Sequence, residues 1–113
     1  MSDFLFVFRA DTNAVPKGSP EEMQAITKQW MDWIGSIAAQ KKLANRGNRL
    51  YPSGKVLRGN NIITDGPYTG VGGTLVSYAI IKADSLEEAV GLAKGCPGLL
   101  FGGSVEVREI NAM

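Results

Sequence analysis

The spacing of apolar residues changes along the chain, and each change predicts a different element. Residues 4–8 are all apolar and include three phenylalanines, which is typical of a strand buried on both faces and therefore central. Apolar side chains then recur at helical spacing from Met23 to Ala38, so we expect a long helix over residues 20–42. Its start, Ser19-Pro20-Glu21-Glu22, combines a serine cap, a proline in the first turn and glutamates at the positive end of the helix dipole.

The middle of the chain combines an irregular stretch with a β-hairpin. Leu43 to Gly59 scatters basic residues among glycine and proline and shows no clear period. The segments 55–58 and 61–64 flank Gly59-Asn60, a two-residue hairpin signal. We expect Asp65-Gly66-Pro67 to end the second arm of the hairpin, because proline cannot donate to a sheet ladder.

Two strands and a short helix complete the pattern. Residues 74–81 have high strand propensity, Ser85 opens a second capping box, Gly95 ends the helix that follows, and Val105 and Val107 belong to a last strand. The order is strand, long helix, hairpin region, strand, short helix, strand. This is the split βαβ, or ferredoxin-like, pattern of an α+β fold, with both helices on one face of an antiparallel sheet.

We expect one domain over residues 1–113 that associates with a second copy of itself. The length is that of a single domain. Because the helices cover one face of the sheet and the central strand is apolar on both, the other face needs a partner. The sequence therefore predicts a homodimer that packs sheet against sheet.

The composition excludes several classes of protein. A formal net charge of +1 gives no electrostatic footprint for nucleic acid or for an anionic membrane surface. No stretch approaches the roughly 20 apolar residues of a membrane span. The apolar run 4–8 is too short for a signal peptide, and the single cysteine cannot form an internal disulfide. The expected compartment is the cytoplasm.

The chain contains no histidine, and this absence restricts its chemistry most. Ser-His-Asp and Cys-His nucleophile systems and histidine metal sites are excluded. A structural zinc site is not expected with one cysteine, so the sequence predicts no metal and no cofactor. Cys96 precedes Pro97 at the end of the short helix, where we favour a structural role over a reactive thiol.

Several short motifs follow one another along the chain in a specific order. They are the apolar first strand, Ser19-Pro20-Glu21-Glu22-Met23, Asp65-Gly66-Pro67-Tyr68, Ala83-Asp84-Ser85-Leu86-Glu87-Glu88-Ala89, Cys96-Pro97 and Gly102-Gly103-Ser104-Val105-Glu106-Val107-Arg108. In this order and spacing the chain resembles the YCII-related family, specifically its DGPF-motif branch, over nearly its whole length. The resemblance implies a ferredoxin-like subunit that forms a dimeric α/β barrel, in a family whose function is largely unassigned.

The chain departs from the family pattern at two places. A His-Asp pair has been suggested as an active site in the founding branch, and its histidine belongs near the start of the first helix, where this chain reads Glu22-Met23. Similar members follow the tetrapeptide with an acidic residue, a lysine and a glycine pair, whereas residues 69–74 read Thr-Gly-Val-Gly-Gly-Thr. The suggested chemistry therefore does not carry over to this chain.

Asp65 is the main candidate for a polar site residue. One interpretation is a carboxylate at the mouth of the sheet cavity that binds a ligand or acts as a base. The other is a turn residue whose side chain accepts hydrogen bonds from nearby backbone N–H groups.

Four further residues are candidates for binding a ligand. Tyr68 and Tyr51 offer phenolic donors, although tyrosines on a sheet usually serve packing. Arg9 and Arg49 would bind a carboxylate or phosphate through two parallel hydrogen bonds, with solvated arginine as the alternative interpretation.

Three functions are consistent with these residues. The favoured one is binding of a small metabolite in the cavity of the sheet-to-sheet homodimer, because few catalytic groups are present. The second is a cofactor-independent enzyme for a small polar or aromatic substrate, with Asp65 as acid/base and Arg9 or Arg49 as anion holder. The third is a regulatory protein–protein module, which predicts an apolar patch that stays exposed after dimerisation.

Overall fold

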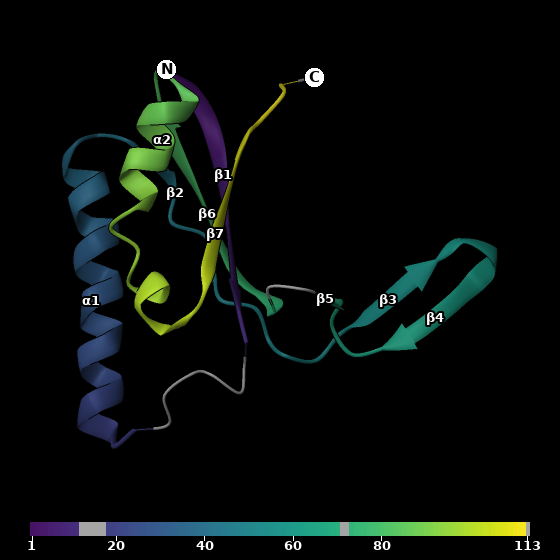
Figure 1. The fold of residues 1–113 in the computed structure, drawn as a ribbon. Coiled ribbons are helices and arrows are strands. Elements are labelled where there is room, and N and C mark those ends of the chain that lie inside the picture. Colours follow the sequence, from purple (N-terminus) through teal and green to yellow (C-terminus); the bar gives the residue numbers. More distant parts are fainter. Residues whose placement is uncertain (12–17, 71–72, 113) are drawn as a thin grey trace.

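The computed structural model describes residues 1–11, 18–70 and 73–112, and it consists of an antiparallel sheet with two helices on one face (Figure 1). The elements in chain order are β1 (Ser2–Ala10), α1 (Pro20–Ala39), β2 (Leu43–Asn45), β3 (Lys55–Arg58), η1 (Gly59–Asn61), β4 (Ile62–Asp65), β5 (Thr69–Gly70), β6 (Gly73–Ala83), α2 (Leu86–Ala93), η2 (Pro97–Phe101) and β7 (Ser104–Glu109).

The strand order confirms the predicted fold class. The main sheet runs β2-β6-β1-β7, with β5 added along β6, and every pairing is antiparallel. This order, with α1 and α2 as the two crossover helices, is the ferredoxin-like arrangement of an α+β domain. As its apolar sequence predicts, β1 is central and pairs with both β6 and β7.

The core lies between the sheet and the helices and is built on the aromatic residues of β1. Phe4, Phe6 and Phe8 are buried on the helix side of the sheet. The indole of Trp33 stacks on Phe6 with ring centroids 6.2 Å apart, and its Nε1–H donates to the carbonyl oxygen of Leu92 at 3.0 Å. That hydrogen bond ties α1 to the end of α2 and satisfies a carbonyl group near a helix terminus.

Neither α1 nor α2 covers the opposite face of the sheet (Figure 1), and we call it the open face. Side chains alternate along a strand, so Leu5 and Val7 of β1 point away from the phenylalanines. The register places Ile80 opposite Leu5 and Tyr78 opposite Val7 on this same face. The open face is thus apolar at its centre.

Both predicted helix starts are confirmed, and the end of the first helix is corrected. The hydroxyl oxygens of Ser19 and Ser85 accept from the backbone N–H groups of Glu22 and Glu88 at 3.2 and 3.1 Å. The helix α1 ends at Ala39 instead of residue 42. The chain turns there, because Lys41 adopts a left-handed φ of 61° that a continuing helix does not allow.

The predicted hairpin exists, but it does not belong to the main sheet. The strands β3 and β4 form a separate two-stranded sheet that projects from the side opposite the helices (Figure 1). Its turn has three residues instead of two, with Asn60 and Asn61 at φ of 63° and 60°. The place beside β6 is taken by β2, which lies in the stretch expected to be irregular.

Gly47 explains how this irregular stretch can follow the edge of the sheet. It has a φ of +68°, and a Cβ at this position would lie 1.6 Å from the carbonyl oxygen of Tyr78. Only glycine allows the chain to approach β6 so closely. Beyond it, Leu50 N–H donates to the Val76 carbonyl at 2.9 Å, so residues 47–50 run along β6 towards the hairpin.

Candidate functional site

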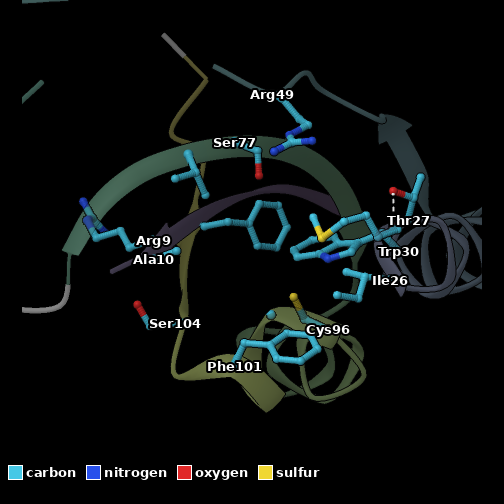
Figure 2. A pocket seen from close by; sticks show the side chains of 15 residues that line it. Arg9, Ala10, Ile26, Thr27, Trp30, Arg49, Ser77, Cys96, Phe101 and Ser104 are labelled. Atoms are coloured by element: carbon cyan, nitrogen blue, oxygen red, sulfur yellow. Dashed lines mark hydrogen bonds between the residues drawn. The ribbon is translucent and has the colours of Figure 1, made fainter. Parts of the chain in front are cut away.

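A pocket of about 290 Å³ opens on the helix side of the sheet, between the first turns of α1, the short helix η2 and the ends of β1 and β6 (Figure 2). Its walls are mainly apolar, with Phe8, Ile26, Trp30 and Phe101 among the largest side chains. A mostly apolar cavity with a few polar groups at its rim is typical of a small-molecule site.

The local backbone explains why the pocket forms at this end of the sheet. The pairing of β1 with β6 shifts by one residue between Phe8 and Arg9, and such a bulge bends a strand. The loop after η2 approaches β1 closely, because a Cβ at Gly103 would lie 2.9 Å from the carbonyl oxygens of Arg9 and Gly98. Glycine at position 103 therefore lets η2 form the floor of the pocket.

Aromatic edges form one wall of the pocket. The rings of Phe8 and Trp30 meet edge to face with centroids 5.2 Å apart, and Trp30 meets Trp33 in the same way at 5.8 Å. Trp30 thus connects the pocket wall to the core. A flat apolar group in the pocket would meet these rings at their faces and edges, as aromatic pairs prefer.

Arg49 is the cation at the rim of the pocket. Its backbone forms an isolated antiparallel bridge with Ser77 of β6, and Ser77 shares the helix side of the sheet with its partner Phe8. Figure 2 shows the guanidinium group beside the Ser77 hydroxyl, above the aromatic wall. Among the residues that the structure describes, no carboxylate forms an ion pair with Arg49.

Arg9 also lines the pocket, but its charge is already matched. Its guanidinium lies 2.7 Å from Oε1 of Glu106, and it points away from the aromatic wall (Figure 2). Glu106 also accepts from Arg108 at 3.2 Å. The hydrogen bonds from Arg108 and then from Arg9 hold the pKa of Glu106 below its ordinary value. Of the two predicted arginines, Arg49 is therefore the one available to an anionic ligand.

The other three predicted residues lie outside the pocket. Tyr51, Asp65 and Tyr68 are exposed on the hairpin or beside it. The carboxylate of Asp65 pairs with the ammonium of Lys55 across the hairpin, and the guanidinium of Arg58 lies 5.7 Å from the Tyr68 ring centroid. The structure thus brings Arg9 and Arg49 to one pocket and does not bring Asp65, Tyr51 or Tyr68 there. Among the described residues, the partner of the Asp65 carboxylate is the Lys55 ammonium and not a backbone N–H group of its own turn.

A comparison with protein families matches residues 4–113 to the YCII-related domain. The chain belongs to the YCII-related domain family. The ferredoxin-like strand order described above agrees with this membership. A search of curated proteins found no match for the chain.

Two negative findings apply to the described residues of this YCII-related domain. Within residues 1–11, 18–70 and 73–112, no group of three or more acidic or cysteine side chains is arranged to hold a metal ion. No helix in the same ranges is long and apolar enough to span a membrane.

The thiol of Cys96 lies at the pocket wall, and its surroundings favour the structural role predicted for it. It is 3% exposed, and burial raises the pKa of the thiol from 9.0 to about 11. At pH 7.5 this shift lowers the thiolate fraction about 100-fold. We expect iodoacetamide to alkylate Cys96 at least that much more slowly in the native YCII-related protein than in urea. Mass spectrometry of timed samples measures both rates, and equal rates would contradict the buried position.

Sequence reasoning missed most of the pocket wall. The sequence places Trp30 within the apolar stripe expected from Met23 to Ala38, and Phe8 in the expected central strand, without any indication that they border a cavity. Phe101 lies in the run Leu99-Leu100-Phe101, between Pro97 and Gly102. An apolar run between two turn residues was the available signal for Phe101, the member of the three that is partly buried, whereas Leu99 and Leu100 are exposed.

Proposed function

We propose that this YCII-related protein binds a small metabolite with an apolar body and one carboxylate group. The observation that carries the proposal is the guanidinium of Arg49, without a carboxylate partner among the described residues, at the rim of an apolar pocket. Arginine binds a carboxylate through two parallel hydrogen bonds, and charge-assisted bonds of this kind are stronger than neutral ones.

The size and the walls of the pocket restrict the apolar body of the ligand. A volume of about 290 Å³ is at the lower end of ligand sites, which usually enclose roughly 300–1,000 Å³. The aromatic edges of Phe8 and Trp30 favour a single flat ring. Aryl carboxylates with one ring, or short acyl carboxylates, are therefore the ligand classes that fit best.

Isothermal titration with benzoate, phenylacetate and hexanoate tests this proposal, with benzamide as the neutral probe. We expect a carboxylate to bind more tightly than benzamide, and Arg49→Gln to weaken its binding about tenfold or more, since a charged hydrogen bond contributes about 1.5–3 kcal/mol. Arg46→Gln removes a neighbouring exposed arginine outside the pocket and is the matched control.

Three results would contradict this assignment. The first is the absence of measurable binding for all three carboxylates. The second is equal affinity for benzoate and benzamide, which would mean that no cation recognises the carboxylate. The third is an equal loss of affinity in Arg46→Gln and Arg49→Gln, which would point to the overall charge of the surface and not to the pocket.

The proposal includes a homodimer that packs open face against open face. The support for it is the apolar centre of that face, formed by Leu5, Val7, Tyr78 and Ile80. Antiparallel sheets with one solvated face usually carry polar residues there, so an apolar face favours a partner. The ligand cavity expected between the two sheets would lie on this side; we favour the pocket under α1 because the chain itself supplies its walls and its cation.

The enzyme alternative has less support. Its candidate acid/base, Asp65, is exposed, pairs with Lys55 and does not line the pocket. Ser77 and Ser104 border the pocket, but the chain has no histidine to activate a hydroxyl group.

A further inference from the structure

The hairpin made of β3, η1 and β4, residues 55–65, receives little support from the other residues that the structure describes. Every residue in it is exposed except Val56, which is half-buried. Its two strands pair with each other over four positions, and they form a sheet separate from the main one. An isolated two-stranded hairpin is at best marginally stable in water, so this hairpin needs another surface to hold its conformation.

One side of the hairpin carries an apolar pair. Leu57 and Ile63 are direct cross-strand partners, and they are 71% and 61% exposed. The ion pair of Lys55 and Asp65 lies two residues along the ladder on the same side, as expected for the polar border of a contact surface. A free hairpin with exposed apolar residues and two unpaired edges is prone to aggregation unless something covers it.

The surface of the whole chain is larger than that of a monomeric protein of its mass. It exposes 8000 Å², whereas a 12.1 kDa monomer is expected to expose about 6,000 Å². The radius of gyration is 15.4 Å, compared with about 13 Å for a compact domain of this length. The excess of about 2,000 Å² per chain is above the roughly 800 Å² that each partner buries in a standard interface, and it fits a homodimer with a large contact surface.

The hairpin projects on the same side of the molecule as the open face, away from both helices (Figure 1). A copy seated on the open face therefore lies within the angle between the sheet and the hairpin. In a two-fold dimer each contact occurs twice, so each hairpin would lie against the other copy.

We propose that residues 55–65 form an arm that packs against a second copy of this chain, with Leu57 and Ile63 as its contact residues. This inference rests on the sheet-to-sheet homodimer proposed above and assigns it a second contact surface. The arm covers an apolar pair that would otherwise be exposed, and the partner supplies the support that the hairpin lacks. The same contact links the stability of the hairpin to dimerisation.

The double variant Leu57→Ser/Ile63→Ser tests the contact. We expect sedimentation equilibrium to show a dimer dissociation constant at least tenfold weaker than that of the wild type. The circular dichroism spectrum is expected to match that of the wild type at concentrations where both are dimeric. Leu100→Ser is the matched control, because Leu100 is 75% exposed but lies in η2, on the helix side of the sheet. Its dissociation constant is expected to equal that of the wild type.

A second measurement uses the wild-type chain and needs no substitution. Hydrogen exchange followed by mass spectrometry is recorded above and below the dimer dissociation constant. We expect amides of residues 55–65 to be protected in the dimer and to exchange rapidly after dilution. Amides at the centre of β1 are expected to remain protected in both samples, since the core of the subunit is intact.

The outcomes separate this inference from the proposals on which it rests. A wild-type chain that is monomeric at all concentrations overturns both the dimer and the arm. A wild-type dimer that the double variant leaves unchanged, with exchange at residues 55–65 independent of dilution, overturns the arm and leaves the dimer standing. Carboxylate binding at Arg49 is measured independently and is not affected by either result.

Discussion

Replacing Leu5 by glutamate is expected to convert the proposed homodimer into a folded monomer. Leu5 lies on the open face of the central strand, between Ile80 of β6 and Arg108 of β7. In a single subunit the new carboxylate would lie at a water-facing surface within reach of a guanidinium group, so the fold is retained. In a sheet-to-sheet dimer the two carboxylates would be buried near each other. Burying incompletely paired charges costs several kcal/mol, which is roughly a thousandfold in the dissociation constant.

Light scattering coupled to size-exclusion chromatography measures the mass of Leu5→Glu at tens of micromolar protein. Met31→Glu is the control, because Met31 is an exposed apolar residue on α1, on the far side of the sheet. It is expected to behave like the wild type in mass and in thermal unfolding. If Leu5→Glu still has the mass of the wild-type dimer at all concentrations, the open face is not the interface. If Leu5→Glu is unfolded, the open face belongs to the folding core and the experiment is repeated with Ile80→Glu.

The parts of the fold that could be predicted are those with a local physical signal. The apolar run of β1 indicated a central strand, and it pairs on both sides. The capping serines Ser19 and Ser85 indicated helix starts, and both accept the expected backbone hydrogen bonds. These signals depend on residues within one turn or one strand of each other. They therefore specify elements reliably and say little about which elements become neighbours.

The place of the hairpin could not be predicted because it depends on a competition between two segments. Both β2 and the hairpin were available to pair with the free edge of β6. The three residues of β2, Leu43–Asn45, have weak strand propensity and gave no periodic signal, yet they occupy that edge. They do so because the chain leaving α1 arrives beside β6, and Gly47 lets it continue along the strand. Tertiary geometry overrides propensity here.

The candidate site could be predicted only in part, because the sequence does not show which segments become neighbours in the fold. Arg9 and Arg49 were chosen for their chemistry, and the bridge between Arg49 and Ser77 brings them to one pocket although they lie far apart in the sequence. The tetrapeptide motif indicates Asp65 and places it at the end of the hairpin, but the sequence does not indicate that this hairpin lies outside the main sheet and away from the pocket. A motif fixes residue types and spacing, whereas a site also requires the register that places strands side by side.

Replacing Trp33 by alanine is expected to destabilise the protein by about 3–5 kcal/mol, as do other large truncations in a packed core. Its indole stacks on Phe6 and meets Phe8 edge to face at 5.8 Å. The Nε1–H group also donates to the Leu92 carbonyl, which would lose this partner. Gly95 opposes the indole and has no side chain that could fill the cavity; an added Cβ there would lie 2.9 Å from the indole.

Urea unfolding at one fixed protein concentration measures the loss, since the stability of a dimer depends on concentration. Trp33→Phe is the matched variant: it keeps a ring against Phe6 and removes the N–H group, so its loss is expected to be clearly smaller. Trp30 packs on Trp33 and forms the pocket wall, so carboxylate binding is expected to weaken in Trp33→Ala under conditions where the variant is still folded. A Trp33→Ala protein with wild-type stability would mean that the aromatic cluster is not the core of the subunit. A destabilised variant that binds carboxylates like the wild type would mean that the pocket does not depend on the aromatic core. It would also mean that the ligand does not contact the wall formed by Trp30.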